Sequence, residues 1–276
     1  MALEVELLSP AKGSNPGGVC NISCLSSGHS KQFYIKYCPG SHLPRESFLR
    51  PSHQPIYEAV TSVKANQLGL NTPNSWVLAN GDLHFKGDSQ LLRKINQHMP
   101  YYFVSEMIPA PSNEDSEKTK FSMNAESFYR DILHVSDIVG KKQNYFFIED
   151  ERGGHLVYLD VGCNFVNASG GFMFFNHDIK THASKIDLRR DLKRLKEYSL
   201  MPSLVNASNF ISLADFVTIS SEIEVPLIDS RDCRKKGLVL GTVLCEQERQ
   251  EITRILAYGV LKHLKDIRAS DLVVRG

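Results

Sequence analysis

The stretch Gly13-Ser14-Asn15-Pro16-Gly17-Gly18 separates two runs with the composition of β-strands. The run before it, residues 3–8, places Val5 and Leu7 on one face of a predicted strand. Because glycine has no side chain, the backbone amides of such a turn can approach phosphate oxygens closely. The turn lacks the Gly-Lys-Ser/Thr ending of a P-loop, and a plain connecting loop remains the alternative.

A lysine and a glutamate follow on two predicted elements. Lys36 lies in a β-like run at 33–37, and Glu58 lies 22 residues later in a predicted helix at 56–68. A lysine in a strand interior either reaches solvent or finds a buried anion. The residues alone leave two alternatives, an ion pair between Lys36 and Glu58 or an edge-strand lysine and a solvated glutamate.

An Asn and an Asp bracket a predicted hairpin with strands at 145–149 and 155–160. Asp160 ends the second strand and precedes Val161-Gly162, and Asn144 precedes the first strand. A hairpin brings both positions to the same end, where their oxygens suit Mg²⁺. The alternative is a turn aspartate and a strand-capping asparagine.

The remaining patterns predict an α+β protein. Strands are expected at 19–25, 75–78 and 101–108, and helices at 125–139, 186–198 and 246–267. Residues 111–120 contain no apolar side chain and are predicted to link a β-rich part, 1–110, to a helical part, 121–276.

Composition excludes several function classes. The formal net charge of the 276 residues is +1, so no global field attracts nucleic acid or membrane. No apolar run is long enough to span a membrane, and the first ten residues lack the basic region of a Sec signal peptide. The six scattered cysteines indicate free thiols in a reducing cytosol, so a cytoplasmic location is expected.

Basic side chains concentrate in the predicted helix at 186–198. A solvated helix face is one interpretation. The other is a docking surface for a polyanion, such as a phosphoinositide head group, an inositol polyphosphate or a phosphorylated partner. The cluster comprises Lys185, Arg189, Arg190, Lys193, Arg194 and Lys196.

The glycine turn, Lys36, Glu58, Asn144 and Asp160 follow one another in an order that resembles the protein-kinase-like superfamily. The most similar groups are bacterial persistence-toxin kinases, type II phosphatidylinositol 4-kinases and bacterial effector kinases. The resemblance spans roughly residues 1–165. It implies a two-lobed fold with a β-rich N-lobe and an α-helical C-lobe, and it implies ATP and Mg²⁺. It assigns roles as follows: residues 13–18 cover the phosphates, Lys36 holds them, Glu58 orients Lys36, Glu106-Met107-Ile108 contact adenine, and Asn144 and Asp160 bind the metal.

The sequence departs from these families at the catalytic aspartate, which usually lies a few residues before the metal-binding asparagine. Residues 139–143 contain no acid, and the nearest one is Asp137, seven positions before Asn144. Three interpretations stay open: Asp137 reaches the site after a rearrangement, the base is absent and activity is low, or the protein is a pseudokinase.

The sequence therefore predicts an atypical kinase that transfers the γ-phosphate of ATP to a protein hydroxyl. The resemblance to effector kinases adds an anionic host activator at the basic helix, and secretion into a host cytosol by a non-Sec route. The alternatives are a phosphoinositide kinase, and a pseudokinase or anion- or partner-binding module. No hydrolase, zinc-protease or dinucleotide motif is found in the sequence.

Overall fold

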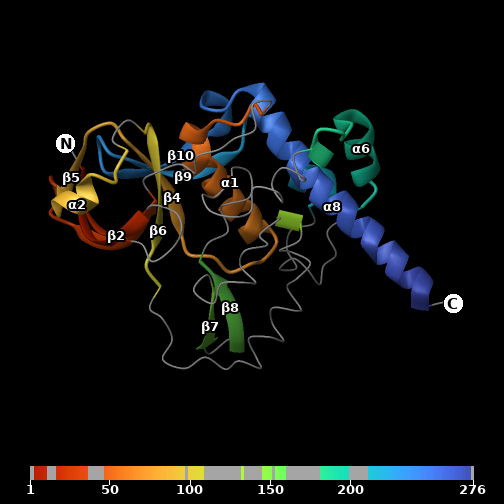
Figure 1. The fold of residues 1–276 in the computed structure, drawn as a ribbon, viewed down its shortest axis with the longest axis horizontal. Coiled ribbons are helices and arrows are strands. Elements are labelled where there is room, and N and C mark those ends of the chain that lie inside the picture. The colour runs from red at the N-terminus through yellow and green to blue at the C-terminus, as the bar shows by residue number, and fades with distance from the viewer. Residues whose placement is uncertain are drawn as a thin grey trace.

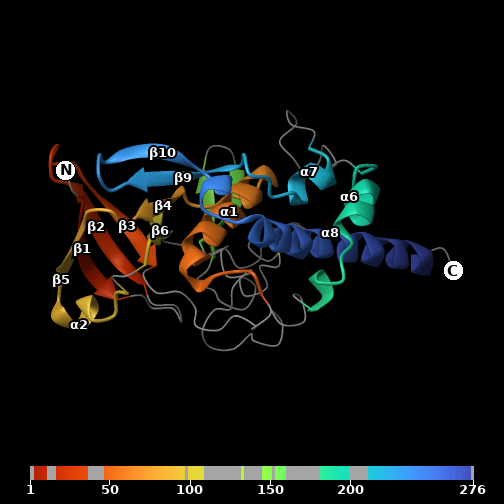
Figure 2. The same cartoon turned by 90° about the horizontal axis from the view of Figure 1, so that it is seen from above.

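The computed structural model describes residues 3–10, 17–36, 47–96, 99–108, 132–133, 145–150, 153–159, 181–198 and 211–274. These residues form an α+β protein (Figure 1). A large sheet lies at one end, helix α1 packs beside it, and the long helix α8 runs away from the sheet toward the C-terminus (Figure 2).

The large sheet has eight strands in the order β10-β9-β4-β6-β3-β2-β1-β5. Strands β1, β2, β3 and β6 follow one another as antiparallel neighbours, whereas β5 pairs with β1 in parallel. The strands predicted at 3–8, 19–25, 33–37, 75–78 and 101–108 are confirmed with shifted ends. A strand that returns beside β4 from His84 was also expected; β5 is present there, but it pairs with β1 and not with β4. The bounds are β1 (Leu3–Pro10), β2 (Gly17–Cys24), β3 (Ser30–Lys36), β4 (Ser75–Ala79), β5 (Leu83–Gly87) and β6 (Tyr101–Glu106).

Two strands of this sheet come from late in the chain. Strands β9 (Glu224–Asp229) and β10 (Arg234–Val239) form a hairpin, and β9 pairs in parallel with β4 through Val77 and Leu227. No strand was predicted in this region from the sequence. The linker at 111–120 lies outside the described residues and stays a prediction, but the sheet contains strands from both sides of it.

Alternate residues of the central strands belong to two hydrophobic cores. Trp76 and Leu78 of β4 lie in the core lined by β1, β2 and β3, whereas Val77 lies in the core shared with the helices. Phe103 of β6 joins Val77 on the helix side. This period of two is what a strand covered on both faces requires.

Helix α1 (Gln54–Gln67) is buried on nearly every side. It packs on β4, β6 and β9, and its apolar residues join the core that also contains α8 (Glu246–Val274). The predicted helix at 246–267 is thus confirmed and longer. The shorter helices are η1 (Pro51–His53), α2 (Ser89–Leu92), α6 (Leu188–Leu195), α7 (Leu213–Val217) and η4 (Leu240–Thr242). Of the helix predicted at 125–139, only residues 132–133 are described, and both are helical.

The predicted hairpin is confirmed as β7 (Tyr145–Asp150) and β8 (Gly153–Tyr158), a separate two-stranded sheet. It is attached to the segment that follows α1, because the Tyr158 N–H donates to the Asn71 carbonyl at 2.9 Å. The end of β8 is therefore held beside the end of α1.

Two glycines allow β2 to approach its neighbours closely. A Cβ atom on Gly18 would lie 2.2 Å from the Ser9 carbonyl oxygen, and one on Gly17 would lie 2.6 Å from that of Ile35. We expect Gly18→Val to lower the free energy of unfolding by about 1–3 kcal/mol, the usual cost of overpacking. Denaturant unfolding measures this, with Asn21→Ala on the same strand as the control. Equal unfolding midpoints for wild type and Gly18→Val would contradict this close approach.

Candidate active site

The structure brings Lys36 and Glu58 together. Lys36 is the last residue of β3, and Glu58 lies in the second turn of α1. Lys36 Nζ is 2.8 Å from Glu58 Oε2, and the two side chains are only 10% and 2% exposed. The ion pair implied by the resemblance is therefore present, and the alternative of an edge-strand lysine with a solvated glutamate is wrong.

Neighbouring groups hold this buried pair in place. Gln54 Nε2, one turn earlier in α1, donates to Glu58 Oε1 at 3.1 Å. Phe103 pairs with Lys36 across β3 and β6, and Lys36 Nζ lies 5.5 Å from its ring centroid, where a cation–π attraction acts. Two charges removed from water require such compensation, because their desolvation is costly.

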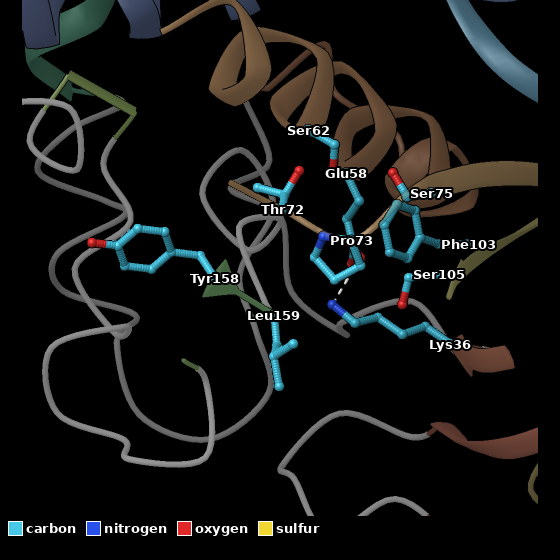
Figure 3. Close-up of a pocket in the computed structure, with 10 residues that line it drawn as sticks. All are labelled: Lys36, Glu58, Ser62, Thr72, Pro73, Ser75, Phe103, Ser105, Tyr158 and Leu159. Atoms are coloured by element: carbon cyan, nitrogen blue, oxygen red, sulfur yellow. Dashed lines mark ion pairs between the residues drawn. The ribbon is translucent and has the colours of Figure 1, made fainter. Parts of the chain in front are cut away.

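The ion pair lines a small hollow that is partly open to solvent. Figure 3 shows Lys36 reaching from the sheet toward Glu58, with Ser75, Phe103 and Ser105 on one side and Leu159 on the other. The lining residues come from α1, the segment after it, β3, β4, β6 and the end of β8. They are Lys36, Glu58, Ser62, Thr72, Pro73, Ser75, Phe103, Ser105, Tyr158 and Leu159.

The predicted glycine turn is described only at its end. Gly13 and Ser14 lie outside the described residues, whereas Gly17 and Gly18 begin β2. Gly17 pairs directly with Lys36 across β2 and β3. The first residue of β2, which directly follows the turn, is thus adjacent to Lys36.

The predicted metal ligands Asn144 and Asp160 and the tentative base Asp137 lie outside the described residues. Their neighbours are described. Tyr145 pairs with Tyr158, so the start of β7 and the end of β8 are at one end of the hairpin, as predicted. Leu159, the residue before Asp160, lines the hollow.

The predicted adenine-contacting segment ends β6. The Glu106 carboxylate forms an ion pair with Lys31 and accepts a hydrogen bond from Asn74 Nδ2 at 2.8 Å. The hydrogen bond from Lys31 is the main reason that the pKa of Glu106 is lowered. The side chain is therefore engaged in the sheet, and Ile108 is half-buried just beyond the strand.

The predicted helix is confirmed but shorter, Leu188–Leu195. It carries Arg189, Arg190, Lys193 and Arg194, whereas Lys185 precedes it and Lys196 follows its last residue. All six side chains are exposed. Buried Asp191 binds two of them, with Oδ1 3.1 Å from Arg190 Nε and 3.7 Å from Arg194 Nη1. For the other four, Lys185, Arg189, Lys193 and Lys196, the described part of the chain contains no ion-pair partner. Helix α6 packs on α7 and α8, and Figures 1 and 2 show it far from the large sheet. None of the six basic residues lines the hollow.

A buried acid that was not among the predicted site residues joins α8 to the start of α1. Glu248 is fully buried; its Oε1 lies 2.7 Å from His53 Nδ1 and accepts from Tyr57 Oη at 2.6 Å. Its Oε2 accepts from the Cys245 N–H at 3.0 Å. Glu248 precedes the buried Ile252 and Ile255 by four and seven residues, so helical phase is the signal that indicates its inward position.

Comparisons with known proteins assign no family. No family model, curated protein or solved structure matches the chain. In the part of the chain that the structure describes, no helix has the length and apolar character needed to cross a membrane.

Proposed function

We propose that the protein is an ATP- and Mg²⁺-dependent kinase with a two-lobed, kinase-like arrangement, which transfers the γ-phosphate of ATP to a protein hydroxyl. The observation that supports this best is the buried ion pair between Lys36 and Glu58, 2.8 Å apart. In protein kinases a lysine on the third strand and a glutamate on the following helix form such a pair, which must be in place for transfer.

The chain's own residues supply positioning and charge. Lys36 binds phosphate oxygens of ATP, and Glu58 holds the ammonium group in the orientation this requires. The glycine turn ends at Gly17, which pairs with Lys36 across β2 and β3, so the turn enters the sheet beside the proposed phosphate-binding lysine. Because phosphoryl transfer has a loose transition state, such positioning accounts for most of the catalysis. Asp137 is the candidate base.

Asn144 and Asp160 are the proposed Mg²⁺ ligands. Their amide and carboxylate oxygens suit a hard cation. The register of β7 and β8 supports the pairing of the two positions, and Leu159, bonded directly to Asp160, lines the hollow beside Lys36. When bound, Mg²⁺ neutralises charge that develops on the phosphates.

Phosphate transfer from γ-labelled ATP tests the proposal. We expect Mg²⁺-dependent labelling of the protein itself or of a generic acceptor protein, and we expect Asp160→Ala to abolish it because metal ligation is lost. Asp150→Ala, at the other end of the same hairpin, is the matched control and should retain transfer. Transfer that persists in Asp160→Ala would contradict the assignment. Nucleotide binding without transfer would indicate a pseudokinase, and labelled lipid in place of protein a phosphoinositide kinase.

The exposed basic face of α6 supports an anionic activator as a separate part of the proposal. Arg189, Lys193 and Lys196 share one face through i, i+4 and i+7 spacing. Transfer is therefore measured with and without a deproteinised eukaryotic extract. Stimulation that is lost in a variant with all three residues changed to Glu would support the activator, and stimulation that persists would exclude this face.

A further inference from the structure

The segment that leads into α1 is joined to the first turns of α8 by hydrogen bonds. Ser47 Oγ donates to Glu251 Oε1 at 2.6 Å, and the Phe48 N–H donates to Glu251 Oε2 at 2.7 Å. A little later in the chain, the Arg50 N–H donates to Tyr57 Oη at 2.8 Å, so the same segment also contacts α1 itself. The entry of α1 is therefore held by a helix from the other end of the chain.

Helix α1 lacks a side-chain cap of its own at its N-terminus. Its N-cap residue, His53, makes no capping hydrogen bond. The His53 ring instead contacts α8, with Nδ1 2.7 Å from Glu248 Oε1. The same oxygen accepts from Tyr57 Oη at 2.6 Å, one turn further along α1. A carboxylate from α8 thus holds the first turn of α1 at two points.

The two residues that Glu248 holds directly precede the residues of the buried ion-pair network. Tyr57 is followed by Glu58. His53 is followed by Gln54, whose Nε2 donates to Glu58 Oε1 at 3.1 Å. Since successive residues of a helix are turned by about 100° around its axis, contacts that fix the first set also fix the direction of the second. Figure 3 shows the Glu58 side chain pointing from α1 into the ion pair.

The apolar contacts of α1 are less directional than this carboxylate. Buried apolar residues of α1 pack on β4, β6 and β9, and hydrophobic burial favours contact without selecting one orientation. Hydrogen bonds, in contrast, depend on both distance and angle. Because Glu248 is completely buried, water does not compete for its partners. The orientation of the start of α1 therefore depends on a side chain from α8.

We propose that Glu248 is a positioning residue for the proposed active site. Through His53 and Tyr57 it holds α1 in one rotation, and in this rotation Glu58 meets Lys36 at 2.8 Å. Without the carboxylate the start of α1 turns away, and the Lys36 ammonium group loses its partner in the helix. The effect of Glu248 on phosphate transfer rests on the proposed function, whereas its effect on the ion pair does not.

The reactivity of the Lys36 amine tests the position of α1 without reference to any activity. A brief, substoichiometric pulse of N-hydroxysuccinimidyl acetate labels the native full chain, and peptide mass spectrometry gives the rate at each lysine. In wild-type protein Lys36, with a side chain 10% exposed, should react slowly, whereas Lys31 on the same strand, 61% exposed, should react fast. Glu248→Gln keeps the size of the side chain. It should raise the Lys36 rate about tenfold, as expected when a hydrogen bond to a charged group is lost, and leave the Lys31 rate unchanged.

Two controls separate positioning from a general loss of stability. Leu195→Ala removes a buried side chain from α6, which packs on α7 and α8, and it changes none of the hydrogen bonds at the start of α1. Lys36 should react at the wild-type rate in this variant. In Glu58→Gln the ion pair is already lost, so adding Glu248→Gln should raise the Lys36 rate no further. An unchanged Lys36 rate in Glu248→Gln, an equal rise in Leu195→Ala, or additive rises in the double variant would overturn the proposal.

Phosphate transfer distinguishes this inference from the proposed function. If wild-type protein transfers phosphate, Glu248→Gln should lower the rate, whereas Glu246→Ala, at an exposed acid in the same helix turn, should not. A wild-type transfer rate in Glu248→Gln, together with an unchanged Lys36 label, would overturn the positioning role and leave the kinase proposal in place. Absence of transfer by wild-type protein, together with a raised Lys36 label in Glu248→Gln, would support the positioning role and contradict the kinase proposal.

Discussion

Lys36→Met should lower the rate of phosphate transfer by roughly 10²–10³-fold, the usual effect of removing one group that stabilises charge in a transition state. The change removes the ammonium group and keeps most of the apolar stem. Because Lys36 and Glu58 form one unit, Glu58→Gln should also lower the rate, although it keeps the shape of the side chain. Labelled ATP measures the transfer, and equilibrium binding of Mg²⁺-ATP provides a second readout.

A double variant separates catalysis from stability. Lys36→Met leaves the Glu58 carboxylate buried without its counter-charge, which costs about 3–5 kcal/mol of unfolding free energy. Combining it with Glu58→Gln removes that charge, so the double variant should recover much of the stability and none of the transfer. If the double variant regained transfer together with stability, the ion pair would have a structural role only. ATP binding by Lys36→Met with the affinity of the wild-type protein would contradict the proposed ATP site.

Glu248→Ala should also produce a large loss of stability, because it leaves His53, Tyr57 and the Cys245 N–H without their shared acceptor. Removing one member of a buried charged network costs about 3–5 kcal/mol. Glu246→Ala removes an exposed acid from the same helix turn and is the matched control, with an expected change of about 0.5 kcal/mol or less. Denaturant unfolding at neutral pH gives both values, and equal losses would contradict the network.

The same carboxylate predicts a dependence of stability on pH. Burial raises the pKa of Glu248, but hydrogen bonds from His53, Tyr57 and the Cys245 N–H outweigh it and lower the pKa to about 2, from 4.5. A lowered pKa stabilises the folded state above the unfolded value, and this stabilisation disappears as the pH falls from 4.5 toward 2. It amounts to about 3 kcal/mol.

Unfolding at about pH 5 and about pH 3 tests this expectation, since these values bracket most of the transition. Wild-type protein should lose clearly more stability between the two conditions than Glu248→Gln, which has no carboxylate at this position. Parallel losses in the two proteins would show that other groups account for the acid sensitivity.

Local patterns were sufficient for the elements that carry the candidate site. Alternation predicted β1 and β3, and helical spacing predicted α1, because each pattern depends on residues close in sequence. The contact between Lys36 and Glu58 followed from the order of the elements together with the resemblance to kinases. Its burial, which distinguishes it from a surface pair, is visible only in the folded chain.

Other features depend on contacts that a local pattern does not encode. The strands β9 and β10 contain Pro226 and three consecutive basic residues at 234–236, and their turn carries no Asn-Gly or Gly-Gly signal. Their place beside β4 is set by a pairing across about 150 residues of chain, as Val77 with Leu227 shows.

The late addition of β9 and β10 has a consequence for synthesis on the ribosome. Until residues 224–239 have emerged, β4 has a partner on one side only, and its apolar residues Trp76, Val77 and Leu78 stand at an open edge. Open apolar edges recruit strands from other chains. The nascent chain is therefore prone to aggregate during the period after β4 has been made and before residues 224–239 emerge. The β9–β10 hairpin ends this period when β9 pairs with the open edge of β4.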